Sequence, residues 1–298
     1  MKKYTFVLII IFFVNTYHLM ACDACGCAMS TAIQPTDRLT FIGLSYRNAY
    51  FSGWHNPVAG QNVFVKEHYS RMDLLAKITI KQRWEFLGVL PYLSARTSEG
   101  TLSQSEFNGV GDISLMGRYA FVNHFGKKVD ARLSAGGGVE LPTGRSNISQ
   151  SDGTIMHIYQ PGSGSVNFVA ILSGGLKWAK YGAAFTAAYR SNGTNKLGYH
   201  RGNSENVTLE IFRDAYIKKI RILPKISVSA ENSNRNLLND LPFSGNTSRS
   251  FVFAGAGIDV YYRHLMINIA TQLPVFQEIT HGQLESKNRL QVSANYIF

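Results

Sequence analysis

The sequence lacks any apolar run long enough to cross a membrane as a helix, which requires about 20 residues. The longest run, nine residues at 6–14, follows Lys2 and Lys3 and precedes a short stretch that ends at Ala21. A basic start, a short apolar region and a small-residue end are typical of a secretory signal peptide. We therefore predict that residues 1–21 are removed on export, and a helical membrane protein is excluded.

Cysteine is also scarce, with three among 298 residues, and all three lie in CDACGC as Cys22, Cys25 and Cys27. The spacing is not that of a zinc finger. The CxxC of this cluster is followed by Gly26 and not by the histidine of a haem-attachment site. The cysteines therefore belong to a separate segment, residues 22–38, that precedes the first predicted strand.

Three interpretations of this cluster remain open. Residues 19–22 (LMAC) fit a lipoprotein cleavage box, in which Cys22 becomes the first mature residue and receives a lipid that holds the segment at the membrane. Alternatively, Cys22, Cys25 and Cys27 form a soft-ligand set suited to Cu(I) or Zn, or Cys25 and Cys27 form a disulfide. We favour lipidation, because the box supplies a position-specific reason for Cys22.

The sequence lacks the usual signs of an enzyme. The GGG at 136–138 lies inside a strand pattern and no helix pattern follows it, so it is not a phosphate-binding loop. A hydrolase needs a nucleophile with a histidine beside it, but nearly all of the eight histidines fall in the signal, in turns or in loops. His157 and His200 are the candidates for a loop metal site or surface chemistry, although solvated histidines are more common. We predict no enzyme and no cofactor.

Charged residues are few, at 16%, and their balance is basic. Removing the signal lowers the formal net charge from +11 to +9, because it takes away two lysines and no acids. A basic balance can indicate nucleic-acid binding, but an exported chain rarely meets nucleic acid, so we expect no such partner.

Alternation of apolar and polar residues runs through most of the chain and predicts β-strands with two unlike faces. In 69–80, for example, Met72 and Leu74 oppose Asp73 and Lys77. The predicted strands are 39–51, 69–80, 84–96, 112–122, 130–141, 165–178, 183–190, 206–216, 224–231, 250–262, 265–276 and 288–298.

The connections between these strands alternate strictly in length. Short turns are predicted at 81–83, 123–129, 179–182, 217–223 and 263–264. Long loops are predicted at 52–68, 97–111, 142–164, 191–205, 232–249 and 277–287. Consecutive connections of an up-and-down barrel lie at opposite rims, so all short turns share one rim and all long loops the other. The sequence therefore predicts an all-β, antiparallel transmembrane barrel of about twelve strands over 39–298, with both termini in the periplasm.

The predicted short-turn rim is rich in cations and aromatic residues, which suit the boundary between lipid tails and headgroups. The cations are Lys81, Arg83, Lys127, Lys128, Lys177, Lys180, Lys218, Lys219, Arg221 and Arg263. The aromatic residues are Trp84, Phe86, Tyr119, Phe121, Phe125, Trp178, Tyr181, Tyr216, Tyr261, Tyr262, Tyr296 and Phe298. Phe298 would then anchor the closing strand of a barrel without free edges. The alternative is a soluble β-sandwich or a lipocalin-like barrel, but the many strand glycines and the alternating loop lengths favour a transmembrane barrel.

Three short stretches carry a family resemblance: VLPYLS (89–94), GVGDISLMGRYAF (109–121) and GGGVELPTG (136–144). Their Leu-Pro-Tyr, Gly-x-Gly-Asp and Leu-Pro-Thr-Gly patterns resemble those of outer-membrane proteins assigned to the meta-pathway of phenol degradation, which are related to long-chain fatty-acid transporters. The match covers about a fifth of the chain. The resemblance implies a barrel with a transport role and leaves the solute open, while Asp112 can equally well bond nearby backbone amides.

Charged residues of both signs are predicted to line the lumen: Asp73, Lys77, Asp112, Arg118, Arg132, Glu140, Glu210, Glu231 and Asp259. Buried ions are costly unless paired, so they should pair across strands or meet water. A twelve-stranded barrel is narrow, so side chains or the loop at 142–164 should fill much of it. We expect a channel in the bacterial outer membrane that contacts lipid and passes small solutes, hydrophobic ones among them, passively. The alternative is a structural or partner-binding surface barrel, with or without a metal at its cysteines.

Overall fold

The computed structural model describes residues 38–58, 61–99, 103–126, 128–149, 153, 155–242, 248–279 and 284–298. The predicted signal peptide and the Cys22, Cys25 and Cys27 cluster lie outside these residues. Within them, no helix is long and apolar enough to cross a membrane.

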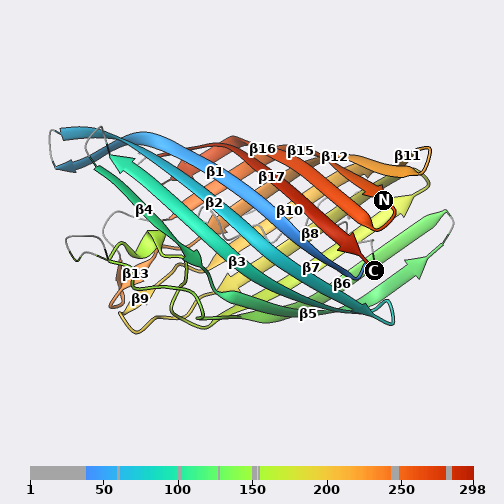
Figure 1. The fold of residues 1–298 in the computed structure, drawn as a ribbon, viewed down its shortest axis with the longest axis horizontal. Coiled ribbons are helices and arrows are strands. Elements are labelled where there is room, and N and C mark those ends of the chain that lie inside the picture. The colour runs from blue at the N-terminus through green and yellow to red at the C-terminus, as the bar shows by residue number, and fades with distance from the viewer. Residues whose placement is uncertain are drawn as a thin grey trace, which may run out of the picture.

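Twelve long antiparallel strands of the described residues form a closed barrel, in which the strands run obliquely to the long axis (Figure 1). They are β1 (Phe41–Val58), β2 (Gln61–Ile80), β3 (Trp84–Glu99), β5 (Ile113–Phe125), β6 (Val129–Leu141), β7 (Asn167–Trp178), β8 (Tyr181–Ser191), β10 (Ser204–Arg213), β12 (Ile220–Ser233), β15 (Arg249–Tyr262), β16 (Leu265–Ile279) and β17 (Glu285–Ile297). The predicted fold class and strand number are confirmed.

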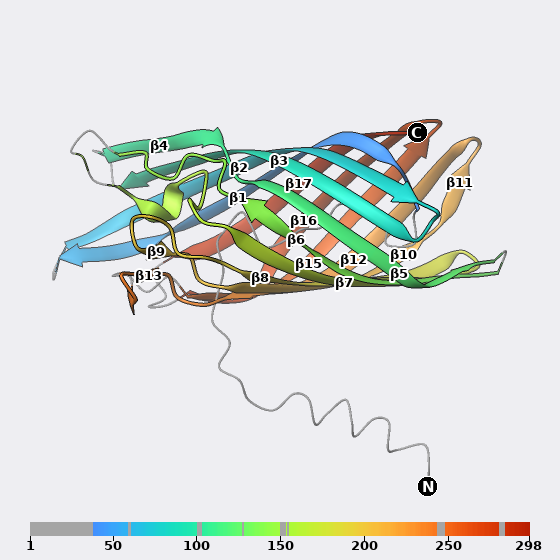
Figure 2. The same ribbon diagram turned by 90° about the horizontal axis from the view of Figure 1, so that it is seen from below.

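Shorter elements complete these strands and their connections. β4 (Ser103–Val110) pairs with β3 and leads into β5, while β11 (Ala215–Ile217) continues β10 and pairs with β12. At the opposite end from the C-terminus, β9 (Tyr199–His200), β13 (Leu237–Leu238) and β14 (Leu241–Pro242) form a small sheet. The single-turn helix η1 (His157–Tyr159) lies at this same end (Figure 2). We call this end the loop end, and the opposite end, which carries the short turns, the turn end.

The barrel closes where its first and last strands meet. β1 pairs with β17 from Phe41↔Ile297 to Ser52↔Glu285, and β10 pairs with β12 across the far side. At the turn end, the amide of Phe298 donates a hydrogen bond to the carbonyl of Thr40, 3.0 Å away. The ladder therefore continues around the whole ring and leaves no open edge between its first and last strands.

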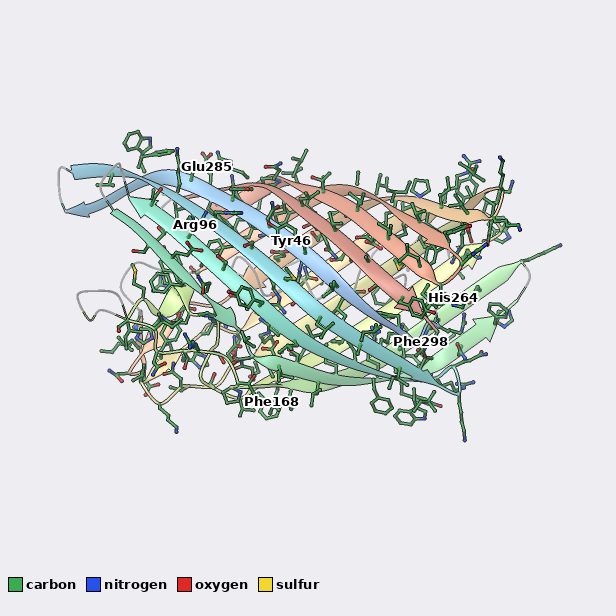
Figure 3. All side chains as sticks on the ribbon, viewed as in Figure 1. Tyr46, Arg96, Phe168, His264, Glu285 and Phe298 are labelled. Atoms are coloured by element: carbon green, nitrogen blue, oxygen red, sulfur yellow. The ribbon has the colours of Figure 1, made fainter. Side chains whose placement is uncertain are left out.

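The alternation in the strands places charged residues inside the barrel and large apolar residues on its outside. In β2, Asp73 and Lys77 are 2% and 3% exposed, whereas Met72, Leu74 and Ile78 are 49%, 43% and 55% exposed. Other exposed residues such as Tyr46 and Phe168 cover the outer face in the same way (Figure 3). An apolar exterior is what lipid requires of a transmembrane barrel.

The turn end carries most of the predicted aromatic residues on its outside. Trp84, Phe125, Trp178 and Phe298 are all exposed. Tyr261 is an exception to the prediction, because its ring is buried inside the barrel. Its parity explains the difference, since Asp259 two residues earlier is also buried and faces the same side.

The loop end is more regular than the sequence suggested. Residues 52–68 and 97–111 were predicted as loops, but β1 and β2 stay paired as far as Val58↔Gln61, and β3 pairs with β4 as far as Glu99↔Ser103. β1 and β2 have 18 and 20 residues, well beyond the about 9–11 that a membrane-crossing strand needs. The two strands therefore project beyond the bilayer, where no lipid enforces apolar alternation.

Candidate functional site

Two apolar layers fill much of the barrel interior. The turn-end layer consists of Phe41, Leu75, Leu87, Val89, Met116, Val169, Ile171, Ala184, Phe212, Leu223, Tyr261 and Met266. The loop-end layer consists of Ala49, Phe51, Tyr69, Ala95, Phe107, Tyr159, Phe251, Phe253 and Ile279. These apolar side chains lie inside the barrel and not on its lipid-facing side. The lumen is therefore not simply a polar channel.

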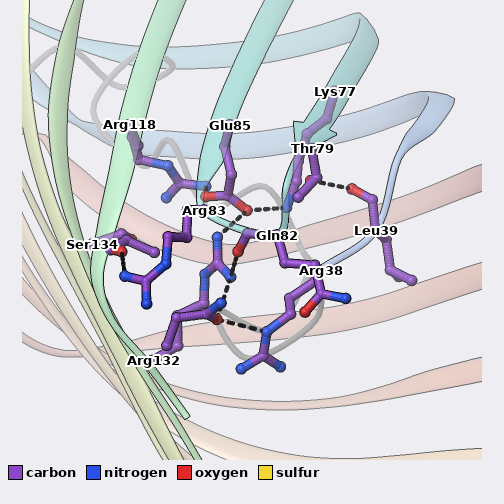
Figure 4. A network of polar contacts seen from close by, with 12 residues as sticks. Arg38, Leu39, Lys77, Thr79, Gln82, Arg83, Glu85, Arg118, Arg132 and Ser134 are labelled. Carbon is purple, nitrogen blue, oxygen red and sulfur yellow. Dashed lines mark hydrogen bonds and ion pairs between the residues drawn. The ribbon is translucent and has the colours of Figure 1, made fainter. Parts of the chain in front are cut away.

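The first group of charges surrounds Glu85, on β3, near the turn end (Figure 4). Its carboxylate accepts Lys77 at 2.7 Å, Arg118 at 3.0 Å and Arg132 at 3.4 Å. Arg132 also donates to the carbonyl of Gln82, 2.7 Å away. One buried carboxylate thus joins cations from β2, β5 and β6, and this arrangement balances only one of their three charges.

A second group lies across the barrel, around Lys225 of β12. Its ammonium group is 3.1 Å from Asp259 and 3.8 Å from Glu210. The amide of Asn268 also donates to Asp259. These contacts connect β10, β12, β15 and β16.

Further ion pairs lie toward the loop end. Asp73 accepts Arg71 at 2.6 Å and Arg47 at 2.8 Å, while Glu231 accepts Arg289 at 2.8 Å.

Glu140 is a third paired carboxylate of this region, in β6. It accepts Arg190 at 2.9 Å, and the amide of Asn167 and the hydroxyl of Ser114 add hydrogen bonds at 3.3 Å. Most of the charge inside the barrel is therefore held in pairs.

Asp112 has a different role from the other predicted lumen residues. It lies at the break between β4 and β5, where it accepts the amide of Gly144 at 2.9 Å and the amide and hydroxyl of Ser163 at 2.7 and 2.6 Å. Gly144 and Ser163 are near the two ends of the 142–164 connection. Asp112 therefore fixes both ends of this connection at the barrel wall.

The η1 turn of that connection packs against the inside of the barrel wall. The hydroxyl of Tyr159, in η1, donates to Glu67 at 2.6 Å, and the ring of Tyr159 stacks on those of Tyr69 and Phe107 with centroids 6.2 and 5.7 Å apart. Burial, and then the neighbouring Glu67 carboxylate, raise the pKa of the Tyr159 hydroxyl. The phenol therefore stays protonated and keeps its hydrogen bond.

The structure thus brings eight of the nine predicted lumen residues into buried or partly buried ion pairs: Asp73, Lys77, Arg118, Arg132, Glu140, Glu210, Glu231 and Asp259. Sequence reasoning missed Glu85, Glu67 and Tyr159. The signal for Glu85 was present, because Trp84 and Phe86 were predicted to lie at the boundary between lipid tails and headgroups, and the residue between them in a strand faces the opposite side. Glu67 and Tyr159 fell in stretches predicted as loops, where parity could not be assigned.

Two of the described histidines stack on tyrosine rings. His68 stacks on Tyr50 and His157 on Tyr199, with centroids 4.3 and 4.6 Å apart. Burial lowers the pKa of His157, in the loop end. Among the residues that the structure describes, no three His, Cys, Asp or Glu side chains converge on a metal position.

These features define the class of the protein: a closed, twelve-stranded transmembrane β-barrel of the outer-membrane type, with a largely filled lumen. A solved structure with a similar fold is the COG4313 outer membrane channel from Pseudomonas putida F1, with a TM-score of 0.61 and 12% identity over 87% of this chain and 96% of that one.

Two other solved barrels match less well. The beta domain of the Bordetella autotransporter BrkA has a TM-score of 0.48 with 12% identity over 87% of this chain and all of that one. The NanC porin has a TM-score of 0.39 with 11% identity over 85% of this chain and 98% of that one. No protein-family model and no curated protein sequence matches the chain, so the resemblance to the phenol-degradation family stays a prediction.

Proposed function

We propose that the protein is a channel of the bacterial outer membrane that passes small solutes with apolar parts, without an energy source or a catalytic step. The observation that carries this proposal is the pair of apolar layers inside the barrel. A pore for small hydrophilic solutes has a polar, water-filled interior, and the apolar layers suit solutes that leave water readily.

The connection at 142–164 is the gate in this proposal. Tyr159 belongs to the loop-end apolar layer, and it is attached to the wall by the side-chain bond to Glu67. Displacement of a loop requires only local changes in backbone dihedrals, whereas β-strands that are paired on both sides cannot leave the ring. A solute that enters from the loop end would therefore move this connection first.

The turn end faces the periplasm in this proposal, and the loop end faces outward. The exposed aromatic residues at the turn end then lie at the inner membrane boundary, and residues 22–38 begin in the periplasm, where a lipid on Cys22 would enter the adjacent leaflet. Lipidation of Cys22 and metal binding by Cys22, Cys25 and Cys27 remain alternative proposals for this segment.

Proteoliposome swelling tests the channel proposal. Vesicles that contain the purified barrel are exposed to neutral solutes of similar size but different polarity, such as benzamide and a pentose. We expect faster swelling with the apolar solute, and a further increase when residues 146–160 are replaced by a short Gly-Ser linker. Swelling no faster than that of protein-free vesicles, for both the native protein and the shortened variant, would reject a channel.

A partner-binding surface barrel is the second candidate, and the β1–β2 hairpin favours it. Trp54 is 61% exposed and packs on Phe64 with ring centroids 5.1 Å apart. Large exposed aromatic residues beyond the bilayer are common anchors of protein interfaces. Loss of cell-surface binding in a Trp54→Ser variant, with unchanged swelling rates, would support this candidate.

A further inference from the structure

A pocket opens at the loop end, between the inward connection and the barrel wall. Its cavity volume is about 60 Å³. β2, β3 and β6 contribute to its wall, and Tyr159 with its neighbours Ile158 and Pro161 covers one side. It is therefore part of the lumen, on the path that the proposed gate controls.

The charges that line this pocket are mostly positive. Asp112 and Glu140 are its two carboxylates, against four guanidinium groups, which gives a formal excess of two positive charges. The four are Arg71, Arg190, Arg201 and Arg249. Lining residues are contacted by Arg47, Asp73 and Glu67. When these three charges are included, the formal excess is one positive charge.

Both lining carboxylates are already engaged by protein donors. Asp112 accepts three hydrogen bonds from Gly144 and Ser163. Glu140 accepts Arg190 and Asn167 and interacts electrostatically with Arg71 and Arg201. The pocket is therefore lined by four guanidinium groups and by two carboxylates that protein donors already engage.

Apolar residues form much of the rest of the wall, together with the polar Ser94, Gln160 and Asn167. Leu93 and Pro91 of β3 and Ile158 and Pro161 of the connection line it, together with the ring of Tyr69. Charged donors and apolar surface within one pocket match a ligand with two unlike ends. Guanidinium groups recognise planar oxyanions by paired hydrogen bonds.

We propose that this pocket binds a small organic anion, with its carboxylate toward Arg201 and Arg249 and its apolar body against Leu93 and Ile158. The inference rests on the proposed channel function and specifies its solute class. It adds selectivity for charge to a lumen that the apolar layers would otherwise make selective for hydrophobic surface alone.

Binding to the detergent-purified full chain at low ionic strength tests the inference, with benzoate and its neutral analogue benzamide as probes in isothermal titration calorimetry. We expect benzoate to bind at least tenfold more tightly than benzamide. In the Arg201→Gln, Arg249→Gln double variant, benzoate affinity should fall at least tenfold while benzamide affinity stays the same. The Arg201→Lys, Arg249→Lys variant should recover part of the loss, because charge is kept.

Arg96→Gln with Arg263→Gln is the matched control, since it removes the same charge at exposed positions outside the pocket and should leave benzoate affinity unchanged. A heat-modifiable gel shift shows that each variant is folded. Equal affinity for the two probes, no binding of either, or equal loss in the control variant would overturn the inference.

The two proposals fail separately. Benzamide-driven swelling without preferential benzoate binding would leave the channel intact and remove the anion site. Preferential benzoate binding without swelling would leave the anion site intact and reject the channel.

Discussion

Removal of one hydroxyl should open the gate. Tyr159→Phe deletes the 2.6 Å hydrogen bond from the inward connection to Glu67 but keeps the ring that packs on Tyr69 and Phe107. A hydrogen bond to a charged group contributes about 1.5–3 kcal/mol. Since about 1.4 kcal/mol corresponds to a tenfold change in an equilibrium constant, the ratio of displaced to inserted connection should rise about 10- to 150-fold.

Single-channel recording in planar bilayers measures this ratio as the fraction of time spent open. Tyr69→Phe is the matched control. Tyr69 also donates to Glu67, at 3.0 Å, but both residues belong to β2, so this bond is present whether the connection is inserted or displaced. The control should therefore leave the open fraction unchanged.

The gate hypothesis is refuted if Tyr159→Phe and Tyr69→Phe give the same open fraction as the native protein while all three are folded. An equal rise in both variants would also contradict it, because that result would point to the charge on Glu67 and not to the attachment of the connection.

Three further predictions concern the wall and the N-terminal segment. Glu85→Gln leaves three buried cations without their carboxylate and should lower the free energy of unfolding by about 3–5 kcal/mol. Glu106→Gln, at an exposed pair, should lower it by only about 0–1 kcal/mol. Urea titration in lipid compares the two variants, and equal effects would contradict the buried network. Leu209→Arg on the outer face should lower the free energy of unfolding by about 2–4 kcal/mol, and Tyr216→Arg at the turn end by about 0–1 kcal/mol. The same titration measures both variants, and a reversed order would contradict the membrane placement. Intact mass of the membrane-extracted protein should show an acylated glyceryl group on Cys22, and an unmodified Cys22 with copper or zinc retained would favour the metal alternative.

Strand positions could be predicted well from the sequence, because lipid outside and polar groups inside enforce a period of two. The strand expected at 130–141 is β6, Val129–Leu141, and that expected at 250–262 is β15, Arg249–Tyr262. Where the strands leave the bilayer this constraint ends, and the sequence pattern no longer marks β1 and β2 beyond Phe51 and before Tyr69.

The apolar layers could not be recognised from composition, since an apolar residue suits either face of the wall. Parity relative to a charged neighbour would have assigned them. Phe251 and Phe253 share the parity of Asp259, and Met266 shares that of Asn268; all are buried. The position of the 142–164 connection, in contrast, depends on contacts between residues as distant in sequence as Glu67 and Tyr159, which no local pattern encodes.

The two apolar layers differ in how they can open. The loop-end layer includes Tyr159, which a displaced connection would carry away. All buried members of the turn-end layer belong to strands, and strands in this half are tied together by Glu85 and its partners on β2, β5 and β6. Their side chains can change rotamer but their backbones cannot leave the ring. Tyr159→Phe should therefore raise the open fraction with little change in unit conductance, because the turn-end layer still sets the width of the path.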